Sequence, residues 1–234
     1  MTPRTPPAPD GALNHRSCLP GLTRSGNPGR LTPAGQQQLL ALNFSRLIDL
    51  RDRTERTVDP PPFLGHPAYL NLPLLPWRNR AFNDATAAAR SNADHMNAML
   101  DHAANQIVTV LGAILDAPPG PVLIHCHAGK DRTGLIAALC SELAGQSRDR
   151  TAADYAASGP HLTAFYTAMQ ARHTPERWAT LAPLAPTHPG DILRTLDHLD
   201  RAWGSPRAYL RAHGLTEAEQ DALARRLHTP FPPA

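Results

Sequence analysis

The sequence predicts an α/β fold in which helices flank a central, mostly parallel sheet and the C-terminal half is helical. Short apolar runs at 46–50 and 121–125 have the length and composition of buried parallel strands. Segments long enough for helices separate these runs, and only helical patterns recur from residue 147 onward. With 234 residues, 41% of them hydrophobic, the chain has enough apolar material for one core.

The chain begins with a segment rich in Pro and Thr, residues 1–12, which we expect to be a disordered tail. A single domain should follow at 13–230. Its first helix is predicted over residues 31–43, because Thr32 can cap it and Pro33 suits the first helical position.

The middle of the chain predicts a second strand and then helices. Residues 68–74 alternate in polarity, and Pro73 and Pro76 restrict this strand to an edge or a strand end. Residues 82–116 contain few helix breakers and predict one or two helices, which the Pro and Gly residues at 118–120 end.

The apolar run 121–125 leads through a polar loop into residues 133–143, which are apolar on nearly every face and predict a buried helix. In open α/β sheets ligands bind at the carboxyl ends of strands, so a site is expected at this junction. The segments predicted to be helical after it are 147–157 with Ser147 as cap, 161–172, 189–202, 205–214 and a last helix opened by a capping box at 216–219.

Composition disfavours several classes of protein. The net charge is only +3 and no block of basic residues occurs, so we expect no nucleic-acid partner. Cys18, Cys126 and Cys140 are odd in number and widely spaced, so we expect no disulfide framework, no metal site and no cofactor. No apolar run reaches the ~18–20 residues of a membrane span, and the N-terminus lacks the apolar core of a secretion signal. A cytoplasmic location is therefore expected, with signal-independent secretion left open; the oligomeric state is not predicted.

One lysine stands among the 23 Lys and Arg residues, and it lies in the junction. The junction reads His-Cys-His-Ala-Gly-Lys-Asp-Arg-Thr-Gly from His125 to Gly134. Since lysine supplies a compact point charge that arginine does not, we expect a specific role for Lys130.

The junction contains the residue types that phosphate chemistry requires. Cys126 would face the N-terminus of the buried helix, where the N–H groups of residues 127–132 and the helix dipole favour an anion such as a thiolate. The planar guanidinium of Arg132 matches two phosphate oxygens and would lie across from the sulfur. Gly129 permits the turn that gathers the amides, and Gly134 would let the helix pack closely.

Four neighbours of these residues have expected supporting or binding roles. Thr133 suits a helix cap, and its hydroxyl could also donate to the sulfur of Cys126. We expect His125 to position the loop by hydrogen bonding and His127 to face the mouth of the site. Ala128 would contribute to the phosphate-binding backbone.

This junction resembles the phosphate-binding loop of the protein tyrosine phosphatase superfamily, in which His-Cys is followed by five residues and Arg-Thr. Residues 128–134 are more narrowly similar to the atypical bacterial branch of tyrosine and lipid phosphatases. Further segments resemble that branch in the same order across residues 20–227: Leu22–Gly26, Ile48–Arg51 with Glu55, Asp154–Tyr155 with Ser158, and Trp203–Ser205 with Tyr209–Leu210.

The resemblance implies a protein tyrosine phosphatase-like fold and a two-step reaction that needs no metal. Cys126 would attack phosphorus, Arg132 would bind the phosphoryl oxygens, and water would hydrolyse the cysteinyl phosphate. In this branch the aspartate inside the loop, here Asp131, would be the general acid. Asp94, which lies 32 residues before Cys126, and Asp84 are the alternatives.

The neighbours of the loop and the substrate leave further alternatives. We expect Lys130 either to contact a second negative group of the substrate or to pair with Asp49, and Arg51 to pair with Glu55. The expected substrate is a phosphotyrosine or phosphoinositide, and a small phosphorylated metabolite such as a sugar, inositol or nucleoside phosphate is the alternative. A catalytically silent binding module is disfavoured, because thiol, guanidinium and carboxylate are all present.

Overall fold

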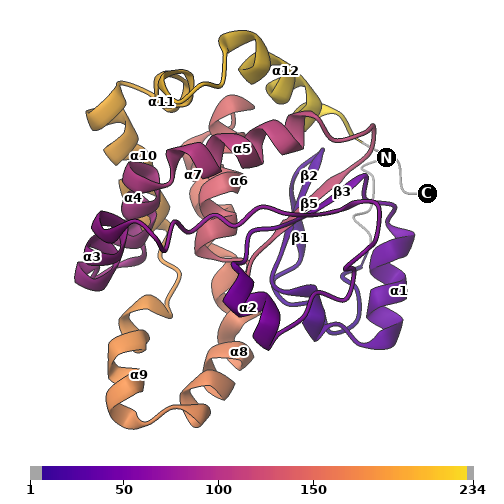
Figure 1. Cartoon of the computed structure of the whole chain (residues 1–234), viewed down its shortest axis with the longest axis vertical. Helices are drawn as coiled ribbons and strands as arrows, with labels where there is room; N and C mark the ends of the chain where they lie inside the picture. Colours follow the sequence, from indigo (N-terminus) through magenta and orange to yellow (C-terminus); the bar gives the residue numbers. More distant parts are fainter. Residues whose placement is uncertain (1–6, 231–234) are drawn as a thin grey trace.

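The computed structural model describes residues 7–230 and has a mixed α/β architecture with a mostly parallel sheet, as predicted (Figure 1). The sheet has the strand order β1-β2-β5-β3-β4. β5 pairs in parallel with β2 and with β3, β3 pairs in parallel with β4, and only β1 runs antiparallel to its neighbour β2. The strands are β1 Arg16–Leu19, β2 Leu22–Ser25, β3 Arg46–Asp49, β4 Tyr69–Asn71 and β5 Val122–His125.

Two strands were not predicted from the sequence. β1 and β2 form an antiparallel hairpin of two four-residue strands, which are too short to show a clear alternation of polarity.

The predicted tail 1–12 is too long. Residues 1–6 lie outside the described residues, but the Asp10 N–H donates to Gln38 Oε1 at 2.8 Å and the Thr32 hydroxyl donates to Asp10 Oδ2 at 2.7 Å. Asp10, which the sequence placed in the disordered tail, is therefore hydrogen-bonded to the first helix and its N-cap residue.

Helices cover the sheet and make up the C-terminal half, as predicted (Figure 1). The predicted segment 82–116 contains three helices rather than one or two, because Asn79 and Ser91 cap separate helices and the chain turns at Ala103. The sequence patterns did not predict α2 Arg53–Val58, α9 Pro175–Leu181 or the 3-10 turns η1 Pro28–Arg30 and η2 Ala182–Leu184. The helices are α1 Pro33–Ala41, α2 Arg53–Val58, α3 Arg80–Ala88, α4 Asn92–His102, α5 Ala104–Leu115, α6 Asp131–Leu143, α7 Arg148–Ala156, α8 Ser158–Arg172, α9 Pro175–Leu181, α10 Pro189–Trp203, α11 Pro206–Ala212 and α12 Glu217–His228, with 3-10 turns η1 Pro28–Arg30 and η2 Ala182–Leu184.

The predicted helix starts are confirmed where a side chain caps the helix. Thr32 accepts a hydrogen bond from the Gly35 N–H at α1, and Ser147 accepts one from the Arg150 N–H at α7. The predicted capping box opens α12. These caps satisfy N–H groups that have no partner inside the helix.

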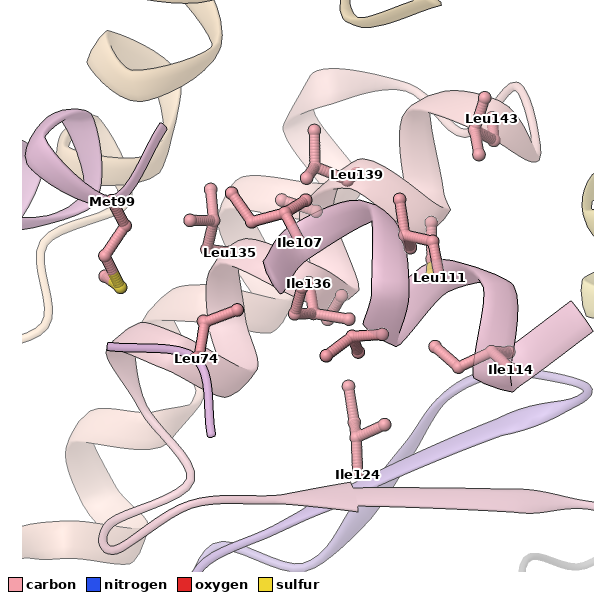
Figure 2. Close-up of a cluster of buried hydrophobic side chains, with 14 of the residues drawn as sticks. Leu74, Met99, Ile107, Leu111, Ile114, Ile124, Leu135, Ile136, Leu139 and Leu143 are labelled. Carbon is pink, nitrogen blue, oxygen red and sulfur yellow. The ribbon is translucent and has the colours of Figure 1, made fainter. Parts of the chain in front are cut away.

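The sheet separates two hydrophobic clusters, which fix the position of the junction between β5 and α6. Val122 and Ile124 contribute to the larger cluster, whereas Leu123 joins the smaller one on the opposite face. Figure 2 shows Ile124 beneath side chains of α5 and α6, which include Ile107, Leu111, Leu135 and Ile136. Burying a side chain of this kind stabilises the fold by roughly 1.5–3 kcal/mol. The start of α6 is therefore held firmly over the carboxyl end of β5.

No single helix in residues 7–230 combines the length and the apolar composition of a membrane span. The pair α4 and α5 reaches them only jointly, and the two helices are bent by 87° at their junction.

Candidate active site

A cavity of ≈ 190 Å³ opens where β5 ends and α6 begins. The loop between them and the first turn of α6 contribute one wall, and α8 contributes the other. Cys126 lines the cavity although only 3% of its surface is exposed. The residues that line the cavity are Cys126, His127, Ala128, Asp131, Arg132, Phe165, Tyr166 and Met169.

The guanidinium of Arg132 is held by Glu55 of α2. Nη1 donates to Glu55 Oε2 and Nη2 donates to Oε1, each at 2.6 Å. The carboxylate is itself fixed, because it accepts the Asp52 N–H at 3.1 Å in the capping box of α2. Burial opposes the charge of Arg132, but the nearby sulfur of Cys126 and the Glu55 carboxylate outweigh it and hold the pKa of Arg132 above its usual value. Glu55 therefore orients the predicted phosphate-binding guanidinium.

The predicted pair between Arg51 and Glu55 is wrong, since Arg51 pairs with Asp49. Arg51 donates from Nε at 3.0 Å and from Nη2 at 2.8 Å to this buried carboxylate. Tyr69 also donates to Asp49 at 3.0 Å. Because both side chains are fully buried, each charge needs an opposite charge as its partner. Arg51 and Asp49 are only two residues apart at the end of β3, so they pair with each other.

The same carboxylate lies near the buried ring of His125. His125 Nδ1 lies 3.8 Å from Asp49 Oδ1 and 3.4 Å from the carbonyl oxygen of Cys126. Burial lowers the pKa of His125, which keeps the ring neutral at pH 7. His125 Nδ1 therefore lies between the strand end of β3 and the backbone of Cys126, and its role in positioning the loop stays a prediction.

Lys130 does not pair with Asp49, which corrects one of its two expected roles. It is 1% exposed, and its ammonium donates to the carbonyl oxygen of Leu184 and, at 3.3 Å, to Asn92 Oδ1. The ammonium also lies 3.6 Å from Asp131 Oδ2. Lys130 is absent from the cavity wall and instead connects the loop to η2 and α4.

Gly129 of the loop and Gly134 of α6 lie where the sequence predicted a need for glycine. Gly129 has φ +68°, and a Cβ there would lie 2.4 Å from the backbone oxygen of Ser25. A Cβ on Gly134 would lie 3.0 Å from the ring of Tyr155, so α6 packs closely against α7 at this point.

Thr133 differs from its expected roles. α6 begins at Asp131, two residues earlier than predicted, so Thr133 lies inside the first turn and does not cap the helix. Its hydroxyl is buried and makes no hydrogen bond among the described residues, so the expected donation to Cys126 is not formed.

Comparison with known proteins gives the family. A sequence model described as the tyrosine phosphatase family matches residues 17–229. The chain belongs to the tyrosine phosphatase family. It is 30% identical over 222 residues to a tyrosine-protein phosphatase of Nostoc commune, a match that covers 87% of this chain and 73% of the relative. It is 28% identical over 246 residues to the triple specificity protein phosphatase PtpB of Mycobacterium tuberculosis, a match that covers 84% of this chain and 87% of the relative. Membership makes this chain a cysteine-dependent phosphatase, a hydrolase of phosphoric monoesters.

The structure separates the three acidic candidates of this phosphatase. Asp131 lines the cavity, and its Oδ1 accepts the Tyr155 hydroxyl at 2.8 Å. Asp94 lies in the first turn of α4, accepts the Arg90 N–H at 2.9 Å and does not line the cavity. Asp84 is exposed and lies 3.7 Å from Arg80 on α3. Only Asp131 is therefore placed beside Cys126.

The second wall of the cavity was not predicted from the sequence. Phe165, Tyr166 and Met169 lie on one face of α8, and the ring of Phe165 packs edge-on against His127 with centroids 5.5 Å apart. Apolar residues at this helical spacing are usual for any buried face, so the sequence pattern does not distinguish a substrate wall from core. His127 also lines the cavity, and its expected place at the mouth stays a prediction.

Proposed function

We propose that this phosphatase hydrolyses phosphotyrosine through a cysteinyl-phosphate intermediate on Cys126. The observation that carries the proposal is the shared cavity, in which Cys126 and Arg132 lie beside a row of backbone donors. The N–H groups of residues 128–132 have no hydrogen-bond acceptor among the described residues. Backbone donors without a partner in the protein suit the oxygens of one phosphoryl group.

In the first step the thiolate of Cys126 attacks phosphorus, the S–P bond forms and the ester P–O bond breaks. Arg132 and the amides stabilise the negative charge on the equatorial oxygens. The leaving oxygen takes a proton from the carboxyl group of Asp131, which is the only candidate acid on the described cavity wall.

In the second step water attacks the phosphorus of the cysteinyl phosphate and gives its proton to the Asp131 carboxylate. The S–P bond breaks, and inorganic phosphate and the Cys126 thiolate are released. The enzyme thereby returns to its starting protonation state.

The walls of the cavity favour an aromatic ester. His127, Phe165 and Tyr166 supply rings next to the predicted nucleophile, and aromatic side chains stack well on an aryl group. The volume of ≈ 190 Å³ exceeds the ~150 Å³ of a protein cavity known to hold a benzene ring. Lys130 is buried and bonded elsewhere, so it does not offer its charge to a second phosphate. These features favour phosphotyrosine over a phosphoinositide or a small phosphorylated metabolite.

A substrate panel tests the proposal. We expect the wild type to hydrolyse an aryl phosphate and a phosphotyrosine peptide much faster than a phosphoinositide, a sugar phosphate or a nucleoside phosphate. Cys126→Ser should abolish hydrolysis, and Cys140→Ser should retain it. Equal rates for wild type and Cys126→Ser would refute the role of the thiol, and turnover of a small metabolite alone would refute the substrate class.

A further inference from the structure

We propose that Asn14 and Arg24 are positioning residues that turn the peptide groups of the phosphate-binding loop toward the phosphoryl oxygens. Neither side chain lines the cavity, and both are buried, with 1% and 0% of their surface exposed. This inference rests on the proposed function of the loop, because it concerns how that same site is held in shape.

Each carbonyl group of the loop between His127 and Lys130 accepts a hydrogen bond from the N-terminal part of the chain. Asn14 Nδ2 donates to the oxygens of Ala128 at 3.1 Å and Gly129 at 2.9 Å. Arg24 Nη2 donates to the oxygens of Gly129 at 2.8 Å and Lys130 at 3.1 Å. The His127 oxygen accepts the Asn27 N–H at 3.0 Å.

The planarity of the peptide bond transmits these contacts to the site. In a trans peptide the carbonyl of one residue and the N–H of the next point in opposite directions. Donors that hold the carbonyls of residues 127–130 on the outer side of the loop therefore direct the N–H groups of residues 128–131 to the inner side. A peptide that flipped would place a carbonyl oxygen against the phosphoryl oxygens and replace an attraction with a repulsion.

No regular secondary structure fixes the backbone of the loop. Residues 127–130 belong to no helix or strand, and Gly129 has a positive φ of +68° that permits other conformations at low cost. The N-cap position of α6, Lys130, makes no side-chain capping bond. Anchors outside the loop are therefore needed to keep one orientation of its peptide groups.

The anchors are themselves held by an ion network between β1, β2 and α7. Arg24 Nη1 donates to Asp154 Oδ2, and Arg16 Nε donates to Asp154 Oδ1 at 2.8 Å. Burial raises the pKa of Asp154, but the two guanidiniums outweigh it and hold the pKa below its usual value. Asn14 has φ +53° and also donates to Ser158 Oγ at 3.2 Å. The fork of Arg24 thus spans a carboxylate and two carbonyls, which a lysine ammonium on its flexible stem would not do.

Two substitutions separate this role from a purely structural one. Arg24→Lys keeps the charge beside Asp154 but loses the fork, and Asn14→Gly removes the side chain at a positive φ that glycine adopts without strain. The matched controls are Arg148→Lys, whose guanidinium pairs with Glu142 and Asp200, and Asn43→Gly, which has φ +48°. Both controls lie outside the cavity wall and donate to no carbonyl of the loop.

The readouts are kcat and KM for an aryl phosphate, the inhibition constant of vanadate, and thermal unfolding. We expect kcat to fall about 10–100-fold and vanadate inhibition to weaken by a similar factor in Arg24→Lys and Asn14→Gly, since the loss of one oxyanion donor typically has an effect of ~10²–10³. Both controls should keep wild-type values of kcat and vanadate inhibition.

If Arg24→Lys does not fold, Asn14→Gly still tests the inference, because it leaves the ion pair between Arg24 and Asp154 in place. A folded Asn14→Gly that retains wild-type kcat and vanadate inhibition would overturn the inference. Inorganic phosphate binding to Cys126→Ser with and without the Asn14→Gly change separates this result from the proposed function. Activity that survives Cys126→Ser would count against the catalytic role of the thiol alone, whereas unchanged phosphate affinity in the double variant would count against the anchors alone.

Discussion

The contact between Glu55 and Arg132 gives a sharp prediction for catalysis. Glu55 does not line the cavity, yet its carboxylate accepts hydrogen bonds from both terminal nitrogens of Arg132, each at 2.6 Å. Glu55→Gln keeps the shape of the side chain but removes the charge and turns one acceptor into a donor that faces a guanidinium N–H. The guanidinium should then lose its fixed orientation across from the sulfur of Cys126.

The size of the effect follows from the kind of bond. Hydrogen bonds to charged groups contribute roughly 1.5–3 kcal/mol each in proteins, and the Arg132 side chain is only 13% exposed, so solvent replaces the loss poorly. A loss of about 2 kcal/mol in transition-state binding corresponds to a decrease of about 30-fold in kcat/KM. Because Glu55 acts through the orientation of Arg132, kcat should fall more than KM rises.

Steady-state kinetics on an aryl phosphate, with thermal unfolding measured alongside, test this prediction. Asp52→Asn is the matched control, because it removes a negative charge that also acts on Arg132 but leaves the two bonds between Glu55 and Arg132 in place. We expect Asp52→Asn to stay within a few-fold of wild type. If Glu55→Gln were as active as Asp52→Asn, Glu55 would not set the orientation of Arg132.

Three further predictions concern the acid, the loop backbone and the pH dependence of stability. Asp131→Asn should reduce kcat about 10²–10⁴-fold and remove the acid limb from the pH–rate profile, whereas Asp94→Asn should leave both unchanged; the opposite pattern would assign the proton to Asp94. Gly129→Ala should lower the melting temperature and activity together, since its Cβ would lie 2.4 Å from the Ser25 backbone at φ +68°; calorimetry that shows no loss would contradict the described close approach. Burial lowers the pKa of His15 from 6.5 to about 4, so between these pH values the unfolded chain binds a proton that the folded chain does not bind. The stability from this group is present above pH 6.5 and is lost as the pH falls toward 4. Urea unfolding across that window should show a shallower dependence on pH in His15→Gln, and parallel curves would contradict the assignment.

The local parts of the site were predictable from the sequence. The junction from His125 to Gly134 is one continuous stretch, so the position of its loop between a buried strand and a buried helix follows from hydrophobic patterns and glycine placement. The helix caps at Thr32 and Ser147 were predictable for the same reason, because each acts on a residue three positions away.

Contacts between distant residues were not predictable from local patterns. Glu55 and Arg132 are 77 positions apart, and no periodicity in the sequence pairs them. Asn14 and Gly129 are separated by 115 positions, and although Leu22–Gly26 resembles a segment of the branch, nothing near Arg24 predicts its contact with the loop. The buried location of Lys130 depends on η2, a segment that the sequence did not predict. In each case the fold supplies a partner that the chain near the residue does not.

Direct trapping of the phosphorylated enzyme tests the central claim about Cys126. The protein is mixed with an aryl phosphate that carries a radiolabelled phosphoryl group, quenched in acid during turnover, digested and mapped by peptide. We predict label on the peptide that contains Cys126, no label in Cys126→Ser, and normal labelling in Cys140→Ser. Label on a different residue, or full turnover in Cys126→Ser, would contradict the claim that phosphate passes through this sulfur.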